Sequence, residues 1–178
     1  NRFAIDCWHY FHHHFHWGSY DNDGAQLEIF IHTTINPNVV ASWSKGCDLI
    51  QFADGAVDYE IMVHEFTHGV VASTSGLAYQ FQSGALDESY ADTMAVIADR
   101  ERGELESPGA LINWTLGENR RAPQPTAAIR SFDQPPTIGG NPDRMGNPAL
   151  MPNPGGFQSL PVGNDFGGVH INSGIPNK

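Results

Sequence analysis

The chain has 178 residues, 40% of them hydrophobic, which is enough for one folded domain or two small lobes. It carries 20 acidic residues against 9 lysines and arginines, a formal net charge of -11 that argues against nucleic-acid and anionic membrane partners. No apolar run approaches the length of a membrane span, and no signal-type segment follows Asn1, as expected of a mature form or a fragment. With only Cys7 and Cys47, a disulfide scaffold is excluded, while one bridge and two free thiols both stay open.

An aromatic, histidine-rich helix is predicted over residues 3–17. Its apolar stripe would consist of Ala4, Cys7 or Trp8, Phe11 and Phe15. The same stretch holds five histidines, His9, His12, His13, His14 and His16. The pairs His9/His13 and His12/His16 have the i,i+4 spacing of helical metal ligands, but no acidic or cysteine partner follows at ligand spacing. Adventitious metal capture is therefore the simpler interpretation, and a His-rich metal-storage role is a remote alternative.

Short strands are predicted after this helix. Residues 19–24 have the Asn/Asp/Gly chemistry of a turn. The pattern Asp21-x-Asp23 is not interpreted as a calcium loop, because the downstream glutamate of an EF-hand is missing. Alternation of apolar and polar residues predicts strands over 27–34, 39–43 and 49–52. A strand edge beside a metal-bearing helix could pair with an extended peptide.

The sequence Val63-His64-Glu65-Phe66-Thr67-His68-Gly69 contains an H-E-x-x-H motif. It lies in a predicted helix from Asp58 or Tyr59 to about Ser73, with Asp58 as the N-cap. Two histidines four residues apart project from one helix face and can bind one metal ion, and a glutamate beside them can take a proton from water at that metal. An ordinary amphipathic helix that carries the motif by coincidence is the alternative.

A second helix is predicted over residues 85–102, ended by Gly103 and Pro108. Its apolar face would consist of Leu86, Tyr90, Met94 and Ile97. Glu88, 20 positions after His68, is a candidate third metal ligand, and Asp92 one turn later could accept the outer N–H of a ligand histidine. A solvated acidic face at a helix N-terminus, including Asp87, is the competing interpretation.

Residues 107–161 are rich in proline and glycine and predict an irregular segment with one strand near 111–116.

Four segments together, residues 64–68, 75–92, 130–131 and 164–175, resemble the thermolysin-like zinc metallopeptidases in order and in local spacing. The resemblance implies an α+β, two-lobed fold, with a β-rich N-terminal part, a helical C-terminal part and the H-E-x-x-H helix at the floor of the cleft between them. Residues 1–60 would be the remainder of the N-terminal lobe and residues 61–178 the zinc-site helices and irregular C-terminal lobe. The family unit continues beyond both ends, so the chain would be truncated relative to it.

The same resemblance implies the roles of the site residues. His64, His68 and Glu88 would bind zinc, and Glu65 would be the general base. Tyr79 and His170 would stabilise the oxyanion of the tetrahedral intermediate, with Asp165 orienting His170 and Asp92 orienting His64. A core position for Tyr79 and a surface ion pair for Arg130 are the alternatives.

Substrate-binding roles follow from the resemblance with some departures. Arg130 would contact a substrate carbonyl, and Ile61, Leu116 and Ile129 would line a hydrophobic but open S1' pocket. The substrate edge would include Ala41 and Trp43, although Val40 stands where the family usually has asparagine, and the nearest asparagine is Asn38.

The resemblance also implies calcium as a second cofactor, because Glu60, Asp99 and Glu118 fall where the family's calcium ligands fall. We expect at most one calcium site, because Asn113 and Thr115 stand where the family commonly has carboxylates. A cluster of solvated acids is the alternative.

The resemblance therefore implies a secreted zinc endopeptidase with peptide or protein substrates and a hydrophobic P1' preference. The alternative is a truncated zinc-binding fragment without activity, with a structural or partner-binding role. The oligomeric state is open.

Overall fold

The computed structural model describes residues 2–34, 39–106, 114–121, 123–124, 127–138, 140–143, 166 and 168–178. The long elements are α1 (Arg2–Phe15), α2 (Tyr59–Ser73) and α3 (Phe81–Glu106). The strands β1 (Glu28–Phe30), β2 (Ala41–Ser44) and β3 (Leu49–Phe52) form one sheet. The short C-terminal elements are β4 (Thr115–Leu116), β5 (Arg130–Ser131), the 3-10 helix η1 (Pro135–Thr137), α4 (Val169–Asn172) and α5 (Gly174–Asn177).

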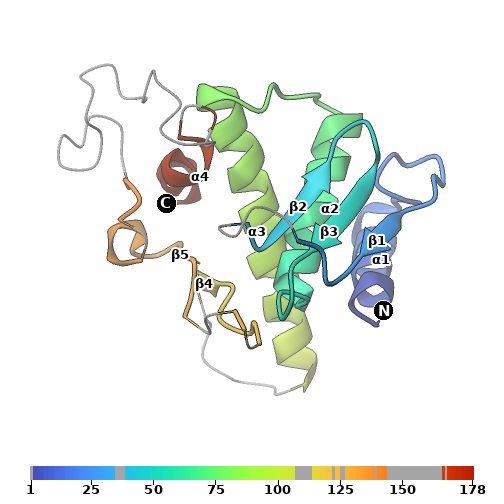
Figure 1. Cartoon of the computed structure of the whole chain (residues 1–178), viewed down its shortest axis with the longest axis horizontal. Helices are drawn as coiled ribbons and strands as arrows, with labels where there is room; N and C mark the ends of the chain where they lie inside the picture. The colour runs from blue at the N-terminus through green and yellow to red at the C-terminus, as the bar shows by residue number, and fades with distance from the viewer. Residues whose placement is uncertain are drawn as a thin grey trace.

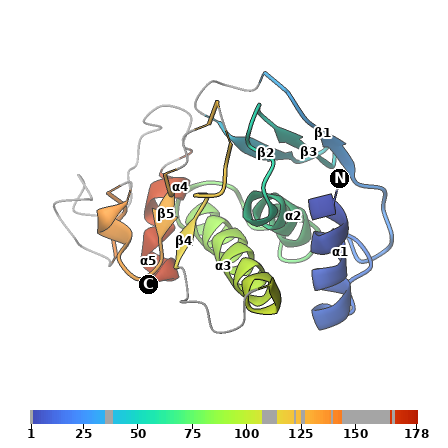
Figure 2. The ribbon, with the colours of Figure 1, turned by 90° about the horizontal axis from the view of Figure 1, so that it is seen from below.

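The sheet has the order β1-β3-β2, with β1 parallel and β2 antiparallel to β3. Figure 1 shows the sheet and α1 on one side of the molecule and the C-terminal elements on the other, with α3 between them. In Figure 2 the sheet lies above the long helices, and α2 lies between α1 and α3. This mixed architecture confirms the predicted α+β class, and α2 is the central helix of the molecule.

The hydrophobic core forms where α1, α2, α3 and β3 meet. Its largest buried side chains include Ile50 and Phe52 from β3 and Met62 from α2. Phe11 of α1 reaches the same core, where the centroid of its ring lies 4.8 Å from that of the Phe66 ring. Every residue of α2 from Tyr59 to Gly69 is buried, so the tertiary packing fixes this helix on all sides. The H-E-x-x-H motif is therefore held on a rigid element.

The predicted bounds of the first elements are close to the observed ones. The N-terminal helix ends at Phe15 rather than at residue 17, and its buried residues are Cys7, Tyr10 and Phe11. Of the two residues predicted as alternatives in the apolar stripe, Cys7 is buried and Trp8 is exposed, and the predicted stripe is wrong at Phe15, which is exposed. Both cysteines are free, with Cys7 buried and Cys47 exposed.

The strand predicted over 27–34 is only three residues long. It stops before His32, whose φ of 58° lies in the left-handed region and ends the extended conformation. The bounds of β3 are as predicted, and β2 is shifted to Ala41–Ser44. Of the strand predicted near residues 111–116, Thr115–Leu116 is observed as β4, and residues 111–113 lie outside the described part.

The prediction for α3 was wrong in its extent and in most of its face. The helix passes through Gly103, and Leu86, Tyr90 and Ile97 are exposed, whereas Met94 packs against the core as predicted. Besides Val96, the buried face consists mainly of small residues and carboxylates, among them Ala85, Glu88, Ala91, Asp92 and Ala95. Alanines allow α3 to approach α2 closely, and the carboxylates meet the histidines of α2 at this interface.

Candidate metal centre

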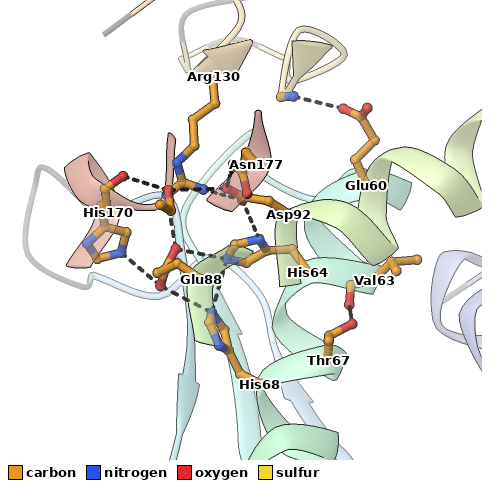
Figure 3. Close-up of polar contacts among 12 residues, drawn as sticks. Glu60, Val63, His64, Thr67, His68, Glu88, Asp92, Arg130, His170 and Asn177 are labelled. Atoms are coloured by element: carbon orange, nitrogen blue, oxygen red, sulfur yellow. Dashed lines mark hydrogen bonds and ion pairs between the residues drawn. The ribbon is translucent and has the colours of Figure 1, made fainter. Parts of the chain in front are cut away.

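The α2 helix presents two histidines one turn apart. Its N-cap is Asp58, as predicted, whose side chain accepts a hydrogen bond of 2.6 Å from the Tyr59 backbone N–H. His64 and His68 are both buried, and their Nε2 atoms lie 3.0 Å apart. The helical spacing therefore produces the convergent pair that the motif predicts (Figure 3).

Glu88 of α3 brings a carboxylate to this pair and is completely buried. Its Oε2 lies 3.6 Å from His64 Nε2, and its Oε1 lies 3.4 Å from His68 Nε2. Among the residues that the structure describes, three or more histidine, cysteine, aspartate or glutamate side chains come close enough to hold one metal ion only at His64, His68 and Glu88.

These three donors fit zinc in chemistry and in spacing. Two imidazoles and one glutamate form a known catalytic zinc ligand set. Two ligands bonded to one tetrahedral zinc ion lie about 3.3 to 3.4 Å apart, given bond lengths of roughly 2.0 to 2.1 Å. The observed donor separations of 3.0, 3.4 and 3.6 Å are close to that value.

Two further carboxylates contact the histidines through their outer nitrogens. His64 Nδ1 lies 3.1 Å from Asp92 Oδ1, a close contact whose angle falls outside hydrogen-bond geometry. His68 Nδ1 forms a hydrogen bond of 2.7 Å with Asp87 Oδ1. The sequence predicts the first contact but not the second, because Asp87 reads as part of a solvated acidic face. The signal that could have identified Asp87 is its position directly before Glu88 at the start of a buried interface.

The electrostatics of this cluster favour ionised carboxylates. Burial raises the pKa of Glu88, but the charges of His170, His68 and Arg130 outweigh it and hold that pKa well below its usual range. Burial lowers the pKa of His68, while its hydrogen bonds to Asp87 and Glu88 raise it well above the ordinary value. Glu88 is therefore an anion at neutral pH, as a metal ligand must be.

Arg130 of β5 is buried and spans two of the carboxylates. It donates from Nη2 to Glu88 Oε2 at 3.1 Å and from Nη1 to Asp92. Burial lowers its pKa, but the charges of Asp92 and Glu88 dominate and raise it above the usual arginine value. Asp92 also accepts a 2.9 Å hydrogen bond from Asn177 Nδ2 of α5. Arg130 is therefore a buried ion-pair partner rather than the surface ion pair considered as the alternative, and Asn177 ties α5 to the same carboxylate (Figure 3).

Tyr79 and His170 lie at the exposed side of the centre. The Tyr79 hydroxyl donates to Glu88 Oε1 and lies 3.2 Å from His170 Nε2. His170 Nε2 in turn lies 3.3 Å from Glu88 Oε1, and its side chain is 49% exposed. Burial and the charge of Glu88 raise the pKa of Tyr79, so its hydroxyl stays protonated as a donor.

Glu65 is buried and close enough to act electrostatically on its neighbours. Its charge contributes to the raised pKa values of both His68 and Tyr79. Glu65 therefore lies on the side of α2 that faces the zinc ligands and Tyr79. Asp165 lies outside the described residues.

The residues assigned to substrate binding lie around α2. Ala41 and Trp43 belong to the edge strand β2, and the Trp43 ring lies 5.0 Å from the ring of Tyr20. Ile61 and Leu116 are buried in the core, and Ile129 packs against it. Asn38 lies outside the described residues.

The three candidate calcium ligands have unequal exposure. Glu60 is buried and its Oε2 accepts a 2.8 Å hydrogen bond from the Gly117 backbone N–H. Burial and the nearby charges of Glu118, Asp99 and Asp58 raise the pKa of Glu60 to about 9, despite that hydrogen bond. Asp99 and Glu118 are half-buried, so this group is not the fully solvated acidic cluster considered as the alternative.

The fold and the centre define a class of protein, the metallopeptidases with an H-E-x-x-H helix and a glutamate on the next helix. Residues 2–72 match the description "Thermolysin metallopeptidase, catalytic domain", and residues 75–178 match "Thermolysin metallopeptidase, alpha-helical domain". The chain therefore belongs to the thermolysin metallopeptidase family.

Similar proteins are bacterial proteases. The chain is 34% identical to Bacillolysin of Bacillus amyloliquefaciens and to Neutral protease NprE of Bacillus pumilus, in each case with 95% of this chain covered. It is 31% identical to an Extracellular elastase of Staphylococcus epidermidis, with 100% of this chain covered. The chain spans 29%, 51% and 33% of the lengths of these three relatives, respectively.

The fold resembles a solved structure, the precursor of protealysin, a metalloproteinase from Serratia proteamaculans. The TM-score is 0.75 at 24% sequence identity, with 99% of this chain and 55% of that chain covered. This likeness supports the two-part metallopeptidase fold.

Proposed function

We propose that this chain carries the zinc site of an endopeptidase, with His64, His68 and Glu88 as the ligands. The observation that carries the proposal is the convergence of these three buried donors at separations of 3.0 to 3.6 Å. Asp87 and Asp92 would hold the two imidazoles in place from outside, as carboxylates commonly do at zinc sites.

Zinc, when bound, supplies a Lewis acid that makes water nucleophilic at neutral pH. Glu65 accepts the proton of the attacking water and delivers it to the leaving amine. Tyr79 and His170 donate to the oxygen that becomes negative during attack, and each such donor is typically worth about 2.7 to 4 kcal/mol. Their mutual distance of 3.2 Å supports a shared role at one acceptor. Asp165 is proposed to orient His170.

A peptide substrate would lie along β2, with Ala41 and Trp43 on the strand that it pairs with. Ile61, Leu116 and Ile129 would give the hydrophobic P1' preference. Arg130 would contact a substrate carbonyl, and its two carboxylate contacts would hold the guanidinium in position.

The mechanism is tested by Glu65→Gln, which keeps the shape of the side chain but removes its basicity. Zinc content should stay near that of the wild type, whereas hydrolysis of a peptide with Leu or Phe at P1' should fall about 10²- to 10⁴-fold. Metal analysis and a peptide cleavage assay on the same preparation measure both quantities. Retained hydrolysis would exclude Glu65 as the base.

A second candidate is a zinc-binding chain without peptidase activity, with a structural or partner-binding role. It is favoured by the altered substrate edge, where Val40 stands in the position that usually holds asparagine in the family. Wild-type protein that contains one zinc per chain yet does not cleave the peptide would support this candidate over the endopeptidase.

Calcium binding by Glu60, Asp99 and Glu118 and a secreted location complete the proposal. The acidic neighbours of Glu60 support a cation there, because a hard cation would offset their repulsion. One relative is named an extracellular elastase, which supports secretion. None of the described helices is long and apolar enough to span a membrane. The division at residue 60 into a β-rich part and a catalytic, irregular part also stays a prediction.

A further inference from the structure

A histidine-lined groove lies between α1 and the C-terminal end of α3. Its volume is about 590 Å³. Asp6, His9, His13 and His14 line it from α1, and Glu101 and Leu105 line it from α3. None of its lining residues belongs to the metal centre described above, so the groove is a separate feature.

The structure distinguishes the two histidine pairs of the N-terminal helix. His9 and His13 are both helical and exposed, and they lie one turn apart along the same groove. The other pair is broken because the helix ends at Phe15 and His16 has a left-handed φ of 55°. His12 stacks on Trp8 at a ring-centroid distance of 4.6 Å and an interplanar angle of 10°. Of the two pairs in this segment, only His9 and His13 therefore have both members inside the helix, one turn apart.

Carboxylates lie at the edges of this pair. Asp6 precedes His9 by one turn and lines the same groove, where it forms an ion pair of 3.5 Å with Arg2. Across the groove, Glu101 lies 2.9 Å from His14 Nε2. Imidazole nitrogens with nearby carboxylates suit borderline divalent ions such as Zn²⁺, Ni²⁺ and Cu²⁺.

We propose that His9 and His13 form a second transition-metal site that stabilises α1. Within the described residues, three donors converge only at the zinc centre, so His9 and His13 have no third protein ligand already in place. Water, or Asp6 after a side-chain rotation, completes their coordination. The two imidazoles lie side by side only while residues 9–13 are helical, so metal binding favours the folded helix by mass action. This role is independent of peptide hydrolysis.

The test is a calorimetric titration of the zinc-loaded protein with Ni²⁺, which avoids redox chemistry at the exposed Cys47. The wild type should bind one equivalent of Ni²⁺ while retaining its zinc, and its melting temperature should rise. The variant with both His9→Gln and His13→Gln should lose this binding phase and the rise in melting temperature.

The matched control carries His12→Gln and His16→Gln, which removes the same number of histidines from outside the groove. It should bind Ni²⁺ like the wild type. Unchanged binding in the His9/His13 variant would overturn the proposal, as would an equal loss in both double variants, which indicates diffuse capture by the tract. Release of one zinc per bound Ni²⁺ would also overturn it. If the double variant does not fold, His9→Gln and His13→Gln tested singly give the same discrimination.

Discussion

Each imidazole of the candidate zinc site contacts a carboxylate through its outer nitrogen. Asp92 and Asp87 both lie on α3, on either side of Glu88, so one helix supplies the third donor and both supporting groups. A carboxylate in this position fixes the tautomer and orientation of the ligand histidine and increases its basicity.

Replacing Asp87 with Asn should weaken zinc binding without unfolding the protein. An amide oxygen can still accept from His68 Nδ1, but the charge that favours the hydrogen bond is lost, so zinc affinity should fall roughly 10-fold, at the lower end of the usual range. Competition with a chelator of known affinity measures the change. Glu101→Gln, on the same helix and outside the centre, is the control and should have no effect. Equal zinc affinity in the Asp87 variant would show that the contact does not support the site.

Sequence reasoning identified the donors better than their surroundings. The i,i+4 spacing of His64 and His68 makes their convergence a local property of the helix, so it can be predicted. The contact between His68 and Asp87 depends on how α3 crosses α2, which local spacing does not specify. The same limit applies to Arg130, whose burial against Asp92 and Glu88 depends on packing between distant segments.

At the scale of elements, the packing of α2 against the sheet depends on Gly69. A Cβ atom there would lie 2.9 Å from Trp43 Cη2 and 2.9 Å from Tyr20 Cβ. The glycine therefore allows β2 and the loop between α1 and β1 to approach the motif helix closely.

Gly69→Ala should destabilise the protein although alanine favours helices. Overpacking typically costs about 1 to 3 kcal/mol, against a gain of at most about 1 kcal/mol in helix propensity. The matched control is Gly103→Ala in α3, where a Cβ would meet no atom within 4 Å, and which should stabilise by about 0.5 to 1 kcal/mol. Urea unfolding of both variants measures the two free-energy changes, and the same sign in both would contradict this explanation.

The helices α2 and α3 show why helix faces are harder to predict than helix positions. The caps of α2 specify its start, and its bounds were predicted within a residue. In α3 the large apolar side chains suggested one buried face, but alanines and carboxylates form the real one. Pattern reasoning ranks residues by hydrophobicity, whereas this interface is selected by close approach and by pairing of charges with the histidines of α2.

At the scale of the whole molecule, stability should depend on pH and cations through Glu60. Its pKa of about 9 in the folded protein exceeds the ordinary 4.5, so the folded state holds this proton where the unfolded state has lost it. This contribution is favourable below pH 4.5 and is lost progressively as the pH rises toward 9.

Glu60→Gln should remove that pH dependence, because glutamine cannot ionise but can still accept from the Gly117 N–H. In calcium-free buffer near pH 8 the variant should be more stable than the wild type by on the order of 1 to 3 kcal/mol, with a smaller difference at pH 5. Added calcium should stabilise the wild type more than the variant if Glu60 is a ligand. Urea unfolding at both pH values measures these differences. An identical pH dependence in the two proteins would contradict the raised pKa, and an equal response to calcium would remove Glu60 from the calcium site.

The central claim is that His64, His68 and Glu88 hold a zinc ion. Anomalous diffraction from crystals of the purified protein, measured on both sides of the zinc absorption edge, tests it most directly. We predict one strong zinc peak about 2.0 to 2.2 Å from His64 Nε2, His68 Nε2 and a Glu88 carboxylate oxygen. Absence of a peak from crystals grown with zinc, or a peak bonded to other residues instead, would contradict the assignment.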